Sequence, residues 1–238
     1  MIARLTRSER GATIVEMGLG LPLILLLGFG GLETARYVLT VMRLNQIAYA
    51  VADNAGRVRH ALDETDVDDI MLGAKLMGGS DFAANGRIVL SDLEQRTTTT
   101  NTNTTALKQW IRWQRCAGAL NKSSSYGGPI DANGAAVTNL SATTNSDHGA
   151  VETKSTIDGM GPSGQQIAAA GGTAVMVVEV FYTYKPLIPY FTFGNRALRV
   201  FEAFNIRQRT DFSVYNAGSL TGTQRSDCTL YNAAVPVV

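Results

Sequence analysis

The sequence is poor in the residues that build metal and redox sites. Its 238 residues include only two cysteines and two histidines. Cys116 and Cys228 lie far apart and match no CxxC motif, and His60 and His148 are also well separated. A zinc site encoded by closely spaced ligands is therefore not expected. The cysteines leave two alternatives, a structural disulfide or two buried thiols, and the cellular compartment decides between them.

An excess of charge of one sign is also absent. Lysine and arginine total 21 against 20 aspartates and glutamates, and no block is rich in basic residues. Because a nucleic-acid-binding domain normally presents a basic face, we expect no nucleic-acid partner. The sequence contains no G-x-S-x-G, H-E-x-x-H or Walker A motif. We therefore expect that the protein is not an enzyme.

One short motif associated with cofactors is present but lacks the right surroundings. Gly159, Gly161 and Gly164 match G-x-G-x-x-G, the pattern of a dinucleotide-binding turn. No apolar strand precedes these glycines, and Pro162 lies among them. We expect neither a cofactor nor a metal ion.

One long apolar run stands out near the N-terminus. Residues 12–32 contain a single charged residue, Glu16. A helix of that length, at about 1.5 Å per residue, spans the roughly 30 Å hydrocarbon core of a bilayer. Arginines precede the run, so the positive-inside rule places residues 1–10 in the cytoplasm and the chain after Glu33 outside it. We therefore expect a single-pass membrane protein.

The apolar run could instead be the core of a cleaved secretory signal peptide. It is long for such a core, and no small-x-small cleavage site closes it, because the sequence GLETAR follows directly. We therefore favour a helix that the mature protein retains.

Glu16 occupies an unusual position for a charged residue. It is the fifth residue after Gly11, basic residues precede it and the apolar run follows, which is the pattern that a prepilin peptidase recognises. The pattern predicts cleavage after Gly11, with Ala12 as the new N-terminus. In an assembled fibre, a buried Glu16 carboxylate could pair with a new α-amino group. The alternative is that Glu16 sits at headgroup depth without a partner.

The N-terminal sequence resembles the TadE-like proteins of the tight-adherence (Tad/Flp) pilus system. That family opens with R-x-x-R-G-A-x-x-V-E-F, then apolar residues with LPLLLLL, then G-x-x-E-x-x-R. The chain matches at Arg7, Arg10, Gly11, Ala12, Val15, Glu16, Leu21, Pro22, Leu23, Glu33 and Arg36. It departs at Met17, where the family usually has phenylalanine or tyrosine. A looser resemblance, including EVFYTYKPL, extends over most of the chain, with a divergent middle.

This resemblance implies a structural component of a Tad/Flp-type pilus or a related secretion apparatus. It implies a pseudopilin that a prepilin peptidase processes and that assembles with other pilin or pseudopilin subunits through its N-terminal helix. The expected location is the bacterial inner membrane, with a cytoplasmic N-terminus and a periplasmic C-terminal domain, or an extracellular pilus. The alternative is a membrane-anchored periplasmic binding module outside any fibre.

The remaining patterns predict an α+β fold like that of pilins. A long N-terminal transmembrane and stalk helix packs on an antiparallel β-sheet of roughly four strands. A second helix is expected at 65–77, capped by Thr65 and ended by Gly78 and Gly79. Strands are expected at 86–95, 106–116, 172–188 and 196–209, with a hairpin tip or mobile loop at 97–105.

These expectations divide the chain into a leader, an anchor and a domain. The expected boundaries are a cytoplasmic leader peptide at 1–11, a transmembrane helix at 12–33, an amphipathic continuation at 34–62, and a periplasmic α+β domain at 63–238 with a long loop region at 121–165. This topology places both cysteines on the oxidising side of the membrane. There a Cys116–Cys228 disulfide would pin the C-terminal tail to the sheet.

Overall fold

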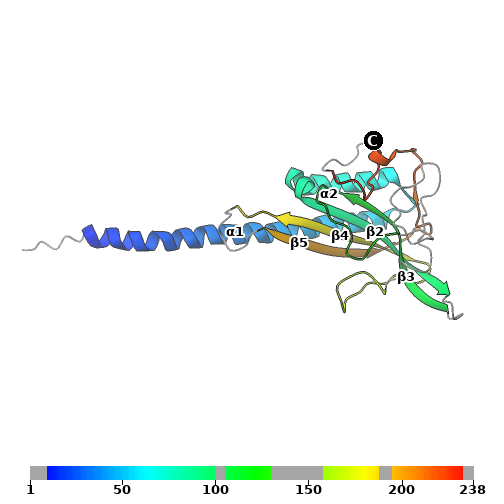
Figure 1. Ribbon diagram of the computed structural model, residues 1–238, viewed down its shortest axis with the longest axis horizontal. Helices are drawn as coiled ribbons and strands as arrows, with labels where there is room; N and C mark the ends of the chain where they lie inside the picture. The colour runs from blue at the N-terminus through cyan, green and yellow to red at the C-terminus, as the bar shows by residue number, and fades with distance from the viewer. Residues whose placement is uncertain (1–9, 100–104, 130–157, 188–194, 233–238) are drawn as a thin grey trace, which may run out of the picture.

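The computed structural model describes residues 10–99, 105–129, 158–187 and 195–232. One long helix extends far beyond a head that contains a sheet, a second helix and the C-terminal tail (Figure 1). Three parts of the chain discussed above lie outside the described residues: residues 1–9 of the expected leader, most of the expected loop region at 121–165, and His148.

Helix α1 (Arg10–Arg57) joins the apolar run and the amphipathic stripe into one element. Its 48 residues correspond to about 72 Å at the α-helical rise. Pro22 lies inside the helix, and the helix is continuous through it. The helix ends at Arg57, five residues before the end of the expected stretch at 34–62.

Helix α2 (Glu64–Asn85) begins and ends differently from the prediction. Its N-cap is Asp63, not Thr65: the Asp63 carboxylate accepts a hydrogen bond from the Thr65 N–H at 3.1 Å. The Asp66 carboxylate in turn accepts one from the Asp63 N–H at 3.0 Å, which completes a capping box. Gly79 kinks the helix, with φ +74°, instead of ending it. The helix resumes because Phe82 is buried against the sheet and stacks on Tyr182.

The main sheet is antiparallel with four strands in the order β3-β2-β4-β5, which confirms the predicted α+β class. The strands β2 and β3 pair up to Thr99 and Thr105, so residues 97–99 and 105 of the expected tip or loop belong to paired strands, and residues 100–104 lie outside the described residues. A short parallel pair, β1 and β6, was not predicted. The strand bounds are β1 (Leu62–Asp63), β2 (Gly86–Thr99), β3 (Thr105–Ala117), β4 (Ala174–Tyr184), β5 (Arg196–Asn205) and β6 (Val214–Tyr215), and a short 3₁₀ helix follows at η1 (Gly222–Gln224).

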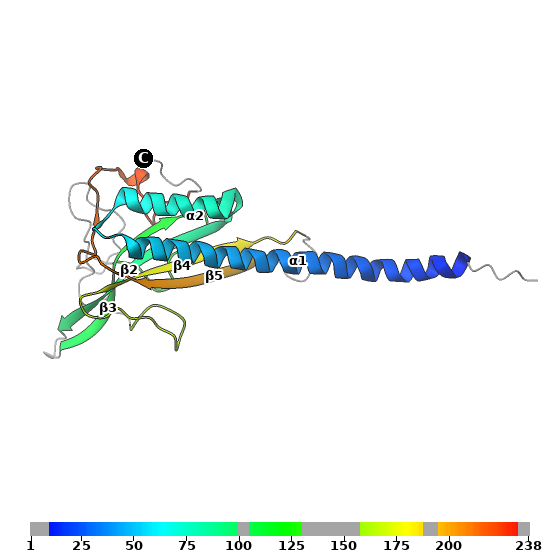
Figure 2. The ribbon, with the colours of Figure 1, turned by 180° about the vertical axis from the view of Figure 1, so that it is seen from behind.

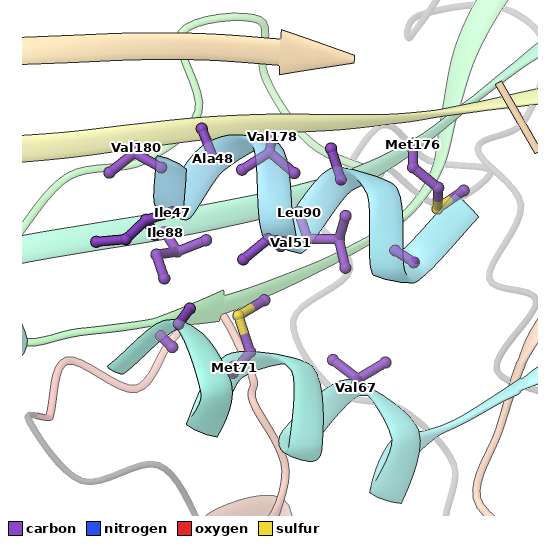
Figure 3. Packing of buried hydrophobic residues seen from close by; sticks show 14 of the residues in the cluster. Ile47, Ala48, Val51, Val67, Met71, Ile88, Leu90, Met176, Val178 and Val180 are labelled. Carbon is purple, nitrogen blue, oxygen red and sulfur yellow. The ribbon is translucent and has the colours of Figure 1, made fainter. Parts of the chain in front are cut away.

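Both helices pack on one face of this sheet. Seen from behind, α1 crosses in front of the strands and α2 lies beside it (Figure 2). The core between the helices and the sheet is mainly aliphatic (Figure 3), with contributions from Ile47, Ala48, Val51, Val67, Met71, Ile88, Leu90, Met176, Val178 and Val180. The second half of α1 is therefore a core helix of the head, whereas its first half leaves the head altogether.

Candidate functional site on the N-terminal helix

The first half of α1 is apolar and exposed along its whole length. Its most apolar stretch has a mean hydropathy of 2.0, and none of that stretch is buried within the chain. Leu19 and Leu27, for example, are 75% and 65% exposed. Apolar surface of this extent is unfavourable in water. By length and composition, this helix can cross a membrane.

The residues predicted for processing, Gly11 and Ala12, and for assembly, Glu16, lie in the first two turns of α1. Gly11, Ala12 and Glu16 are all exposed, and a methyl group added at Gly11 would meet no atom within 4 Å. Ala12 and Glu16 are four residues apart, so they lie on the same face of the helix. Among the described residues, the Glu16 carboxylate has no hydrogen-bond or ion-pair partner. None of these three residues is therefore covered by another part of the chain that the structure describes.

Glu33 marks the point where α1 reaches the head. It is the first buried residue of the helix, with 1% of its surface exposed. Its carboxylate accepts hydrogen bonds from the Tyr184 hydroxyl and, at 2.9 Å, from the Leu187 N–H. Tyr37 packs edge-on against the Tyr184 ring, with the ring centroids 5.3 Å apart. Burial, and then the bond to Glu33, raise the pKa of Tyr184 to about 12, so the hydroxyl stays protonated and donates.

Glu33 is visible in the sequence as part of a motif, but no role could be assigned to it there. The one feature of the sequence that draws attention to Glu33 is its position directly after the apolar run. Its partner Tyr184 lies 151 residues further along the chain, at the end of β4. Together they form a polar junction that fastens the exposed half of α1 to the sheet.

The model of a protein family described as TadE-like protein matches residues 11–53. This stretch is a TadE-like domain. The TadE-like domain coincides with α1, beginning at Gly11 and ending four residues before the helix does. It includes Ala12, Glu16 and Glu33, whereas the sheet of the head lies outside it. No curated protein and no solved structure matches the chain.

The two cysteines lie outside the TadE-like domain, in the head, and they form a disulfide. Cys116, near the end of β3, is bonded to Cys228 in the C-terminal tail. The Cys116 N–H donates to the Ser226 carbonyl at 2.7 Å. Buried Arg87 donates to the carbonyls of Cys228, at 2.7 Å, and Gly118, at 2.8 Å. The predicted disulfide is confirmed, and it holds the tail against the sheet.

The G-x-G-x-x-G residues form a tight turn rather than a dinucleotide site. Met160 and Ile167 pair in an isolated antiparallel bridge around this turn. Gly159 and Gly161 have φ of +149° and +136°, and a Cβ on Gly159 would lie 2.6 Å from the Ile167 carbonyl oxygen. Residues 158–173 contain no helix that could face a phosphate. These glycines are explained by backbone geometry.

Metal ligands are not grouped in the part of the chain that the structure describes. No set of three or more histidine, cysteine, aspartate and glutamate side chains there is placed to hold a metal ion. The features that remain as a candidate functional site are the exposed segment at 11–16, where processing is predicted, the apolar helix and the polar junction at Glu33.

Proposed function

We propose that the protein is a non-enzymatic pseudopilin of a Tad/Flp-type pilus or a related secretion apparatus. The observation that carries this proposal is the coincidence of the TadE-like domain with a helix whose apolar half is wholly exposed. A prepilin peptidase cleaves after Gly11, and the mature chain begins at Ala12. The N-terminus lies in the cytoplasm, and the head lies on the periplasmic side of the inner membrane or within a fibre.

In this proposal the two halves of α1 have different tasks. The apolar half lies in the membrane and then packs against the helices of other pilin or pseudopilin subunits. Cleavage leaves an α-amino group at Ala12 that can pair with Glu16 of a neighbouring subunit in a low-dielectric environment. The junction between Glu33 and Tyr184 keeps the head attached to this helix at a defined angle.

The mature N-terminus provides the decisive test. We expect mass spectrometry of protein from cells with an active prepilin peptidase to show a chain that starts at Ala12. Gly11→Arg should leave the precursor uncut, because a bulky cation replaces the residue before the scissile bond. Gly11→Ala, which keeps a small side chain at an open position, serves as the matched control and should still be processed.

The same measurement separates the pseudopilin from a membrane-anchored binding module. A plain anchor requires no cleavage after Gly11. An intact Met1 in cells with active peptidase would therefore contradict the proposed function.

A further inference from the structure

A cavity of about 270 Å³ lies directly beyond the junction at Glu33. Its walls come from α1, from the part of α2 around the kink and from the end of β4. The side chains with polar groups that line it are Arg36, Thr40, Arg43, Asp81, Tyr182 and Tyr184. The cavity therefore lies where the exposed apolar half of α1 meets the head.

The arginines give this cavity a net positive charge. Arg36 and Arg43 are both exposed and are seven residues apart, which places them two turns apart on one face of α1. Neither forms an ion pair with any residue that the structure describes. Asp81, the one carboxylate of the lining, is already engaged by the Tyr182 hydroxyl and by the Asn85 side-chain amide at 2.9 Å. The lining of the cavity therefore includes two arginines and a single carboxylate.

The depth of these arginines follows from helix geometry. The apolar run ends at Leu32, so Arg36 lies about 6 Å and Arg43 about 17 Å further along the helix axis. The headgroup layer on each side of a bilayer is roughly 5–8 Å thick. Helical side chains lean toward the N-terminus, which in α1 is the direction of the membrane. Arg36 thus lies at headgroup depth, and the long Arg43 side chain can reach down toward it.

We propose that this cavity binds the phosphate group of an anionic phospholipid in the membrane leaflet that faces the head. Guanidinium groups bind phosphate through paired, charge-assisted hydrogen bonds, and two of them border one cavity. The bound lipid would hold the head at a fixed height and rotation on the membrane. The inference rests on the membrane placement of α1 in the proposed function, and it requires neither cleavage nor assembly.

Arginine modification provides a test at the level of single residues. The full chain is reconstituted in nanodiscs of phosphatidylcholine, with or without phosphatidylglycerol, and treated with phenylglyoxal, and mass spectrometry gives the rate at each arginine. We expect phosphatidylglycerol to slow modification of Arg36 and Arg43 by about threefold or more. Arg196 is the internal control. It is exposed, it lies opposite Tyr184 in the register of β4 and β5, and it does not line the cavity. Its rate should not change.

Two further arms identify the source of the phosphate. Inorganic phosphate added to phosphatidylcholine nanodiscs should give no protection, and equal protection by the free ion would overturn the lipid assignment. The double variant Arg36→Gln, Arg43→Gln should lose its enrichment in co-purified phosphatidylglycerol relative to wild type, while Arg196→Gln retains it. Equal rates with and without phosphatidylglycerol, or equal slowing at Arg196, would also overturn the proposal. Any such failure would leave the N-terminal mass result, and with it the proposed function, unaffected.

Discussion

Glu16 and Glu33 lie near the two ends of the apolar half of α1, in opposite environments. Glu16 is exposed and has no partner in the part of the chain that the structure describes. Glu33 is buried and accepts hydrogen bonds from Tyr184 and Leu187. The bonding capacity of Glu33 is thus used within the chain, whereas that of Glu16 is available to another molecule. The two residues call for different measurements.

Glu16→Ala should spare membrane insertion and impair assembly. Removing a charge from the apolar segment favours insertion, since an acidic side chain is costly there. The same change removes the partner of the new α-amino group. Membrane fractionation and counting of surface fibres measure the two effects, with Glu16→Asp as the control that keeps the charge. Fibres at the wild-type level in the Glu16→Ala strain would show that Glu16 has no role in assembly.

Tyr184→Phe should destabilise the head. The ring stays, but the buried Glu33 carboxylate loses one of the two donors that it has among the described residues, which costs about 1–3 kcal/mol in the free energy of unfolding. Tyr182→Phe is the matched control two residues earlier on β4, where the lost bond is to exposed Asp81 and the cost should stay below about 1 kcal/mol. Urea unfolding of the detergent-solubilised full chain measures both values. Equal costs would contradict a special role for the junction.

At the scale of elements, the kink in α2 shapes the cavity beside α1. Gly78 is buried, and a Cβ there would lie 2.6 Å from the Phe82 side chain. Gly79 has φ +74° and ψ −178°, a backbone conformation that is essentially restricted to glycine. The pair therefore lets α2 turn so that Phe82 reaches the sheet and Asp81 reaches Tyr182.

Gly79→Ala should destabilise the protein by about 1–3 kcal/mol, because alanine is strained at this φ and ψ. Gly73→Ala on the same helix is the matched control. A methyl group added at Gly73 would meet no atom within 4 Å, and the backbone there is helical, so alanine should stabilise the helix by about 0.5–1 kcal/mol. Thermal unfolding followed by circular dichroism distinguishes the opposite signs. Two changes of the same sign would contradict the assigned role of Gly79.

At the scale of the whole molecule, the chain has two ends with different chemistry. One end is an apolar helix that is exposed on all sides. The other end is a head in which the Cys116–Cys228 disulfide links the C-terminal tail to β3. The bond joins residues 112 positions apart. For that separation the chain-entropy model gives about 4–5 kcal/mol as an upper value. A cross-link of this kind persists in an oxidising compartment, which agrees with the proposed periplasmic head.

Thiol alkylation of protein taken from intact cells tests this arrangement. Both cysteines should resist alkylation in denaturant and become reactive only after reduction. The matched samples are both denatured, one with reductant and one without. Because the denaturant exposes buried thiols, only a disulfide can then protect the cysteines from alkylation. Alkylation in denaturant without reductant would show reduced thiols in the cell and would contradict a head on the oxidising side of the membrane.

The sequence by itself determined the elements whose signals are local. The apolar run and the amphipathic stripe specified α1 because helix formation and membrane insertion depend on consecutive residues. β-branched and aromatic runs specified the strands for the same reason. The spacing of Gly11 and Glu16 likewise specified the candidate processing site. The start of α2 was misplaced by two residues because Asp63, Thr65 and Asp66 all suit a helix start, and only backbone geometry shows which one is the cap.

Only the tertiary structure decided which contacts close the fold. Glu33 was visible in the sequence, but its donors come from residues 151 and 154 positions further along the chain. The cysteines allowed two states, and the fold brings their Cα atoms to 4.7 Å in a disulfide. Gly79 carries the signature of a helix end, yet α2 continues because Phe82 gains a buried site on β4. Each of these outcomes depends on contacts between segments that are far apart in the sequence. A local sequence pattern does not specify which distant segment will pack against it.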